Sequence, residues 1–329
     1  MVRRTPSDTV SITAPVANIA NAYALASERG ISLSDLTVQA WGHFIDSETP
    51  SFSKRKSEAK SRTKSSFFDG IRIKDIDLSD YETRPAEHTA RKILWGQFSR
   101  FLPIKYTLRI LASFPEHPVS LVDWQDAVRE HSFLMREHLR DKDLRNRIPR
   151  GTQLSAGFPR GKSNKKTQSM ERFLSHYTAV IQSGGAGPVV GMCAELGFIN
   201  MDMASKQVSL TPEGIQYVQL PNPQLDGDPA SISSTTIEER RFLIMHLSSK
   251  LTEDWGFCQD ILSAISEGGN TSDLLFNAMS QKYPELTANI LRTNLGGALG
   301  RLGDLRMVSR SWEGRTSQFQ VVADLEAAV

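Results

Sequence analysis

The stretch that decides the fold is NLGGALGRLGDLRMVSRSWEGRTSQFQVV, residues 294–322. Its first part continues a helical pattern, because apolar residues recur at helical spacing. Its second part contains MVSRSW and SQFQVV, which are rich in Val, Phe and Trp and are joined at Gly314, as is typical of a β-hairpin. The sequence therefore predicts one helix over 286–305, loosened at Gly296–Gly297, and two antiparallel strands directly after it. The apolar positions of that helix are Leu286, Ile290, Leu291, Leu295, Leu299, Leu302 and Leu305.

Two shorter helical patterns precede this helix. They are GFCQDILSAISEGG and NTSDLLFNAMSQKYP, which together cover residues 256–284. A Ser or Thr just before an Asp, as at Ser272, is a favourable context for the start of a helix. Three helices followed by a hairpin resemble the winged-helix superfamily, and LGRLGDLRMVSRSWEGRTSQFQV is similar to its passage from third helix into wing. The resemblance covers about 256–324 and implies a helix for the major groove and a hairpin for phosphate or the minor groove.

Similar patterns occur earlier in the chain. A helix, a turn and a second helix are predicted at 16–41 and again at 105–128, alike in residue types rather than identities. Residues 187–220 predict a helix, two strands and a closing helix that begins at Thr211 with Pro212 in its first position. That stretch also resembles a winged-helix module.

The expected fold class is therefore mainly α with small β-hairpins, arranged as tandem winged-helix modules. The expected divisions are a helix-turn-helix-like module with a basic segment at 14–80, a helical module ending in a basic loop at 85–168, a winged-helix-like module at 169–221, a proline-rich linker at 222–235 and a C-terminal winged-helix domain at 236–329.

The composition limits the classes of protein to which the chain can belong. The 329 residues are 39% hydrophobic and 23% charged, as in ordinary soluble globular proteins. There is no 18-residue apolar run and no apolar segment behind the N-terminal arginines, so neither a membrane span nor a secretory signal is expected. The two cysteines, Cys193 and Cys258, form no CxxC pair, which fits a reducing cytoplasm and argues against a thiolate zinc site.

The net charge of +2 hides two basic islands. Residues 54–64 carry six cations and one Glu, and residues 145–166 carry many cations and no acid. Such islands are suited to a polyanion, although solvated loops are the alternative explanation for both. The paired IPRG and FPRG segments of the second island predict an extended basic loop that follows a DNA backbone and becomes ordered only on binding.

A dinucleotide-binding fingerprint is imitated by AVIQSGGAGPVVGMCAELGFINMD, residues 179–202. The fingerprint requires its third glycine where Val190 stands. The apolar residues of 173–181 also share one helical face, so the supposed strand is predicted to be the last turn of a helix. Gly184–Gly187 is then a helix stop, and Pro188 begins the next helix.

Other catalytic patterns are weak. A nuclease could use Asp46, Glu58 and Lys60, but the last two lie in a run of Ser, Lys and Arg that does not alternate as a strand would. His131 and His138 are seven apart, whereas zinc pairs on a helix usually sit about four apart, so a solvated helix face is the better interpretation. No catalytic residue, metal ligand or cofactor is therefore expected.

Polar side chains on the predicted third helix, the wing and the basic islands are the candidate DNA contacts. Arg and Asn can read bases, whereas Ser and Thr mostly hold phosphate. The candidates are Lys54, Arg55, Lys56, Lys60, Arg62, Lys64, Arg150, Arg160, Lys162, Asn289, Arg292, Thr293, Arg301, Arg310 and Arg315.

The sequence thus predicts a non-enzymatic, cytoplasmic and nucleoid-associated protein that binds double-stranded DNA, as a regulator, a replication initiator or the DNA-recognition subunit of a larger complex. Other subunits of a DNA-processing complex are the further expected partners, and a membrane is not one. Two alternatives stay open: a structural adaptor that binds protein through its winged helices, and a magnesium-dependent nuclease whose winged helices position it on DNA.

Overall fold

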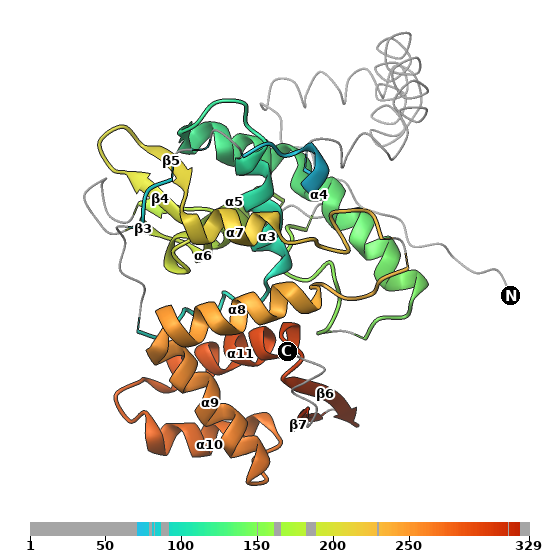
Figure 1. The fold of residues 1–329 in the computed structure, drawn as a ribbon. Helices are drawn as coiled ribbons and strands as arrows, with labels where there is room; N and C mark the ends of the chain where they lie inside the picture. The colour runs from blue at the N-terminus through green and yellow to red at the C-terminus, as the bar shows by residue number, and fades with distance from the viewer. Residues whose placement is uncertain are drawn as a thin grey trace, which may run out of the picture. The chain divides into compact units, whose positions relative to one another are not determined.

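The computed structural model describes residues 71–78, 81, 83–86, 92–149, 151–160, 166–181, 189–228, 230–314 and 316–322. Residues 67–329 form one compact unit. The described part is mainly α-helical with a few small antiparallel strand pairs, which confirms the expected fold class at this level (Figure 1). The basic segment expected at 54–64 lies outside the described residues.

The bounds of the described elements are as follows. The helices are α3 (Leu102–Ala112), α4 (Leu121–Arg145), α5 (Lys166–Tyr177), α6 (Met192–Glu195), α7 (Pro212–Gln219), α8 (Ile237–Lys250), α9 (Thr252–Ser266), α10 (Ser272–Lys282) and α11 (Ala288–Asp304), with a 3-10 turn η1 at Ile73–Asp75. The strands are β1 (Val119–Ser120), β2 (Val180–Ile181), β3 (Val189–Val190), β4 (Ile199–Asp202), β5 (Gln207–Leu210), β6 (Val308–Glu313) and β7 (Thr316–Val321).

Threonine begins four of the described helices. The Thr236 hydroxyl accepts from the backbone N–H of Glu239 at 3.1 Å, and the Glu239 carboxylate accepts from the N–H of Thr236 at 2.9 Å. Thr211, Thr271 and Thr287 cap α7, α10 and α11 through their side-chain oxygens. Each cap satisfies an N–H that the helix itself leaves without a partner, which explains why these helices begin where they do.

The central helix of the described unit is α3, every residue of which is buried. It contacts α4, α5, α6, α7 and β5. Even its two charged side chains are enclosed: Lys105 pairs with Glu239 at 3.2 Å, and Arg109 pairs with Asp226. Because buried charges must be paired to be tolerated, these ion pairs tie α3 to the chain that follows α7.

Two of the sheets share one arrangement. In the first, β1 pairs with β5, which pairs with β4. In the second, Thr271 makes a single bridge to Gln318 of β7, which pairs with β6. In both, the residues just before a helix pair with the second strand of a hairpin. The structure therefore repeats this strand arrangement at 119–210 and at 271–321, although the first stretch also contains the β2–β3 pair.

The junctions between helix and hairpin match as well. Gly197 and Arg306 both have positive φ, +70° and +58°, at the end of α6 and α11. Three backbone hydrogen bonds of the first junction have counterparts in the second. The bond from Gly197 N to Ala194 O matches that from Arg306 N to Gly303 O, and the bond from Phe198 N to Cys193 O matches that from Met307 N to Leu302 O. The bond from Thr211 N to Phe198 O matches that from Val322 N to Met307 O. This equivalence was visible in sequence only as two wing-like stretches.

Three expectations need correction. Helix α5 ends at Tyr177, and β2 pairs antiparallel with β3, so Val180–Ile181 is a strand rather than part of a last helical turn. The next helix starts at Met192, not at Pro188, because β3 comes first. Helix α11 runs without a break through its paired glycines.

The segment 222–235 is packed rather than a solvated linker. Asn222, Gln224 and Leu225 are at most 2% exposed. The Asn222 amide donates to both carboxylate oxygens of Glu239, at 3.1 and 2.9 Å. A proline-rich composition suggested a linker, but Asn222 bonds Glu239 of α8, and Gln224 accepts from Lys142 of α4 at 2.9 Å.

Residues 94–101 run across α11 at close range. The N–H of Gly96 donates to Asn294 Oδ1 at 3.1 Å, and the N–H of Phe101 donates to Asp304 Oδ2 at 2.9 Å. A Cβ built on Gly297 would lie 2.4 Å from Gly96 O, so only glycine allows this approach. The small residues of the opening stretch therefore serve a backbone-to-backbone contact.

Candidate nucleic-acid interface

The C-terminal elements α9, α10, α11, β6 and β7 form a helical layer with a hairpin attached. Strand β7 contacts α9, and β6 contacts α11. In Figure 1 the hairpin stands out beside the helices at the C-terminal end of the chain. This arrangement presents the N-terminal half of α11 and the outer face of the hairpin to solvent.

The N-terminal half of α11 carries three of the predicted contacts. Asn289 and Arg292 are exposed, and Thr293 is half-buried. The Arg292 guanidinium lies 3.8 Å from the centroid of the Phe276 ring and 3.7 Å from Asp273. Thr293 donates to the carbonyl of Asn289 at 2.8 Å, so its hydroxyl hydrogen is already used within the helix.

Arg301 was expected on the same outer face, and this expectation is wrong. Its side chain is 1% exposed. The guanidinium donates to both oxygens of Asp254, at 2.8 and 3.0 Å, and to the carbonyl of Phe98 at 2.8 Å. Position 301 shares its helix face with the buried Asn294, so it faces residues 94–101 instead of solvent.

The hairpin holds Arg310 in a defined orientation. Its Nη2 and Nε donate to the Ser317 hydroxyl at 2.6 and 3.2 Å. Its guanidinium lies 4.5 Å from the centroid of the Trp312 ring, and that ring is 48% exposed. Burial lowers the pKa of Arg310, although a guanidinium shifted in this way still carries its charge at neutral pH. The sequence analysis did not predict that the Trp312 ring contacts Arg310. A signal was available, because residues two apart on a strand have side chains on the same face.

The structure brings this arginine to the basic loop. A Cβ built on Gly151 would lie 2.9 Å from Arg310 Nη1, and the Arg100 guanidinium donates to Gly151 O at 3.2 Å. Arg310 of the hairpin therefore lies next to Gly151 of the basic loop, although the two parts were predicted separately.

The described part of that loop is folded rather than extended. Leu154 and Phe158 are buried. The Asp143 carboxylate accepts from the N–H groups of Leu154 and Ser155, at 2.8 and 3.0 Å. The expectation of an extended loop that orders only on binding is therefore wrong for 151–160. The Phe158 ring packs against Tyr106 of α3 and Phe173 of α5, and this packing overrides the loop composition.

Arg160 lies on the surface near other cations. Burial, together with the nearby charges of Arg140 and Arg160, lowers the pKa of Arg136, and Glu137 opposes that shift. The remaining predicted contacts lie outside the described residues, as do Asp46, Glu58 and Gly184–Gly187. Those contacts are Lys54, Arg55, Lys56, Lys60, Arg62, Lys64, Arg150, Lys162 and Arg315.

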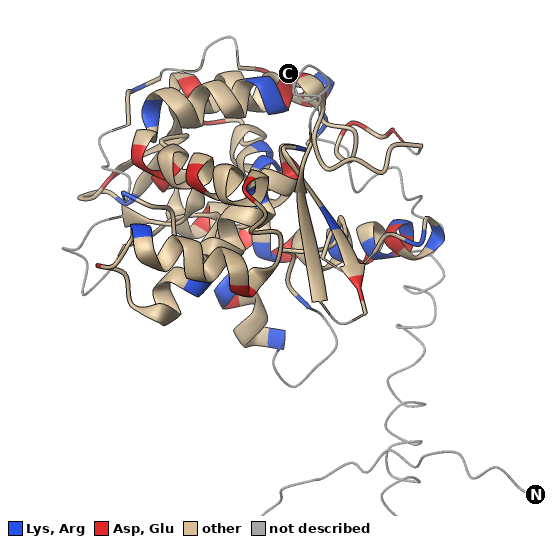
Figure 2. Cartoon of the chain, turned by 90° about the horizontal axis from the view of Figure 1, so that it is seen from below, with Lys and Arg blue, Asp and Glu red and all other residues tan. Residues whose placement is uncertain are grey.

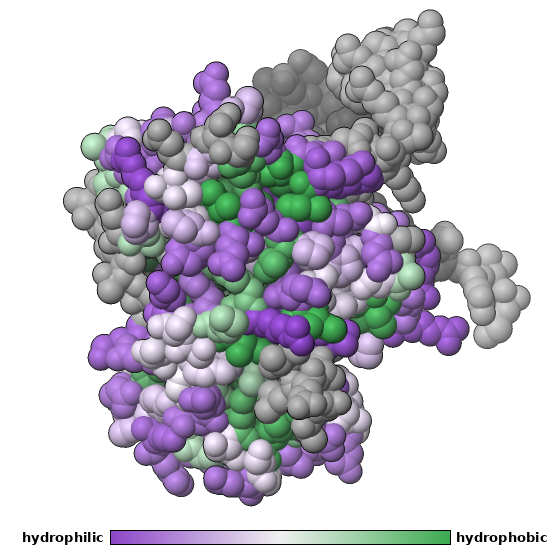
Figure 3. Space-filling view, in the orientation of Figure 1, coloured by the Kyte–Doolittle hydropathy of each residue, from purple (hydrophilic) through white to green (hydrophobic). Residues whose placement is uncertain are grey.

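The surface of the described elements is mixed in charge and hydropathy. Figure 2 shows basic and acidic residues interspersed over the described elements, rather than gathered into one basic face. Figure 3 shows hydrophilic residues over much of the visible face, with hydrophobic ones in separate groups. Ile290 on α11 and Leu274 on α10 are each 48% exposed, so the surface of these two helices carries apolar side chains beside the charged Arg292 and Asp273.

The helix that directly precedes the first hairpin, α6, is much shorter than α11, which precedes the second hairpin. Helix α6 spans only Met192–Glu195, and all four of its residues are buried. It therefore offers no exposed helical face that could lie in a groove, although its hairpin repeats the geometry of β6 and β7.

No protein-family model matches this chain, and no curated protein or solved structure is significantly similar to it. Among the described residues, no helix is long and apolar enough to cross a membrane. Nor does that part of the chain place three or more His, Cys, Asp or Glu side chains where they could share a metal ion.

Proposed function

We propose that the chain binds double-stranded DNA through the N-terminal half of α11 and the β6–β7 hairpin, as a winged-helix protein. The observation that carries the proposal is the element order from α9 to β7, closed by the bridge between Thr271 and Gln318. Three helices, a short strand before the second helix and a two-stranded hairpin are the parts of a winged helix. The matching strand pattern at 119–210 supports the part of the proposal that concerns tandem modules.

In this proposal α11 enters the major groove by its N-terminal end. Asn289 is suited to adenine and Arg292 to guanine, because each can make two hydrogen bonds to the base edge. Arg310 lies on phosphate, held by Ser317 and by the Trp312 ring. A guanidinium that is already oriented loses less side-chain entropy when it binds.

A second function is favoured by the two exposed apolar side chains near α11. Ile290 and Leu274 are unusual on a surface that contacts only phosphate and base edges. With Arg301 buried, Arg292 is the one exposed arginine of α11. Both features suit an adaptor whose helix binds a protein partner.

The test is fluorescence anisotropy with a 30-base-pair duplex over a salt series. We expect binding that weakens steeply with salt, and a slope that falls by about one for each phosphate contact removed. Arg310→Ala should lower the slope. Lys250→Ala, which removes an exposed cation on α8, is the matched control and should leave it unchanged.

Three results would decide against the proposal or redirect it. No binding at low salt would overturn it and favour the adaptor. An unchanged slope in Arg310→Ala would remove the hairpin from the interface. Cleavage of the duplex in Mg²⁺ that Glu58→Ala abolishes would establish the nuclease instead.

A further inference from the structure

The β6–β7 hairpin carries an exposed tryptophan close to its turn. Trp312 lies two residues before Gly314, which is part of the turn. Trp312 pairs with Ser317 across the hairpin, and Arg310 pairs with Phe319. Paired residues share a face of a sheet, and Ser317 and Phe319 are both buried. This face of the hairpin is therefore covered near the helices and open near the turn.

The Arg310 guanidinium covers one side of the Trp312 ring. It lies 4.5 Å from the ring centroid, and its Nη1 would be 2.9 Å from a Cβ built on Gly151. The guanidinium thus lies between the ring and the loop that follows α4. Because the ring is nevertheless 48% exposed, the surface that it offers to solvent is the side that points away from Arg310.

The first hairpin shows that the fold does not require this arginine and tryptophan. The bonds that match at the two junctions place Met201 of β4 at the position of Arg310. Met201 is buried. Strand β4 ends at Asp202, one residue before the position that corresponds to Trp312. Apolar packing alone therefore closes a hairpin of this kind, and the pair formed by Arg310 and Trp312 is an addition to it.

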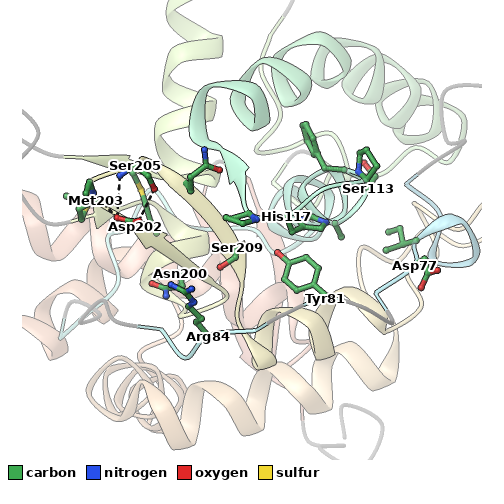
Figure 4. A pocket seen from close by; sticks show the side chains of 18 of the residues that line it. Asp77, Tyr81, Arg84, Ser113, His117, Asn200, Asp202, Met203, Ser205 and Ser209 are labelled. Carbon is green, nitrogen blue, oxygen red and sulfur yellow. Dashed lines mark hydrogen bonds between the residues drawn. The ribbon is translucent and has the colours of Figure 1, made fainter.

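The other face of the first hairpin also has neighbours. Asn200 and Ser209 lie on that face and line a polar pocket of about 1300 Å³ together with Tyr81 and His117 (Figure 4). The Tyr81 hydroxyl accepts from the backbone N–H of Leu210 at 2.5 Å. The first hairpin is thus packed on both faces, whereas the second keeps exposed side chains at its turn.

The charges near the Trp312 ring favour a polyanion. In the loop that follows α4, Arg145 and Arg147 are exposed, and no residue from 144 to 160 is acidic. The one carboxylate within β6 and β7, that of Glu313, lies on the opposite face and accepts from Gln318 at 3.1 Å. An aromatic ring among cations suits a nucleotide, because the base stacks on the ring and the phosphate meets the cations.

We propose that Trp312 stacks on an unpaired base, so that the preferred ligand is duplex DNA that carries a single-stranded tail. This inference rests on the DNA binding proposed above and specifies its substrate. Within a continuous duplex the neighbouring base pairs cover both faces of every base, and the ring reaches one only if the base leaves the stack. An unpaired base beside the duplex offers its face without that cost. Helix α11 and Arg310 then hold the paired part.

The experiment is fluorescence anisotropy of the full chain with three forms of one 30-base-pair duplex. The first form is blunt, the second has a short thymidine tail, and the third has an abasic tail of the same length. The two tails carry the same charge and differ only in their bases. We expect the thymidine tail to bind at least about fivefold more tightly than the abasic tail, which is the lower end of what one stacked base contributes.

Two variants of Trp312 test the ring itself. Trp312→Ala should remove the preference for the thymidine tail, and Trp312→Phe should keep part of it, because a smaller ring still stacks. Trp312→Ala also releases Arg310, which weakens all three forms alike, so the ratio between the two tails is the measured quantity. Ser311→Ala, on the opposite face of the same strand, is the matched control and should keep the full preference. Circular dichroism checks that each variant is folded.

The outcomes separate this inference from the proposed function. Equal affinity for the two tails would overturn the inference, and so would a preference that survives in Trp312→Ala. In both cases continued binding of the blunt duplex would leave the proposed function standing. Binding of the thymidine-tailed form alone would uphold the stacking and refute the duplex contacts of α11. No binding of any form at low salt would overturn both.

Discussion

Two adjacent glycines of α11 should respond in opposite directions to alanine. A Cβ at Gly297 would lie 2.4 Å from Gly96 O and 2.5 Å from Gly96 Cα. A Cβ at Gly296 would meet nothing within 4 Å. Both positions lie inside the same unbroken helix, so helix propensity is equal for the two. Only the tertiary contact differs between them.

The magnitudes follow from that difference. Alanine in a helix interior is more stable than glycine by about 0.5–1 kcal/mol, so Gly296→Ala should raise the free energy of unfolding by about that amount. Gly297→Ala gains the same helix-propensity stabilisation. Its new Cβ must displace the backbone at Gly96, however, and overpacking of this kind costs about 1–3 kcal/mol. The shift also strains the hydrogen bond from Gly96 N–H to Asn294, which is 3.1 Å long. We therefore expect a net loss of about 1–2 kcal/mol.

Urea unfolding followed by circular dichroism measures both variants against the parent chain. The expected result is a higher midpoint for Gly296→Ala and a lower one for Gly297→Ala, with unchanged m-values. Equal stability of the two variants would refute the reasoning, because it would mean that residues 94–101 do not approach α11 as closely as the structure has them.

Two further predictions concern buried polar groups. Arg301→Met leaves the Asp254 carboxylate buried without its guanidinium and should cost about 3–5 kcal/mol of unfolding free energy. Adding Asp254→Leu should recover part of that loss, and no recovery in urea titrations would contradict the pairing. Burial lowers the pKa of His176 to about 4, so the folded chain binds a proton less readily than the unfolded chain, and stability should fall as the pH drops from 6.5 towards 4. His176→Phe should flatten that fall between pH 7 and pH 5, and an equal fall in the variant would exclude His176 as its cause.

Much of the secondary structure followed from local sequence. Apolar spacing predicted α9, α10 and α11, and two stretches rich in Val, Phe and Trp near the C-terminus predicted β6 and β7, because these signals depend on neighbouring residues only. Thr211 was likewise predicted to begin α7. Errors occurred where a segment was short: Val180–Ile181 was assigned to a helix because its apolar residues continue the pattern of α5.

The candidate site was predictable in part. Asn289, Arg292 and Arg310 are placed by the structure on α11 and the hairpin as expected. The contact between Arg310 and Gly151 joins parts about 160 residues apart, and no local signal encodes that distance. The pocket lined by Tyr81, His117 and Asn200 is of the same kind, since these residues come from three separated segments of the chain.

The sequence by itself determined the mainly helical class, the order of the C-terminal helices and hairpin, and the cap of α7 at Thr211. It placed the start of α10 at Ser272, one residue after the cap that the structure shows at Thr271. Tertiary structure alone decided which polar residues those helices bury. As an arginine on a helix, Arg301 is expected at the surface, but in the structure it is buried and donates to Asp254 and to the carbonyl of Phe98. The reason is physical: periodicity describes the faces of one helix, whereas burial depends on which distant segment covers each face.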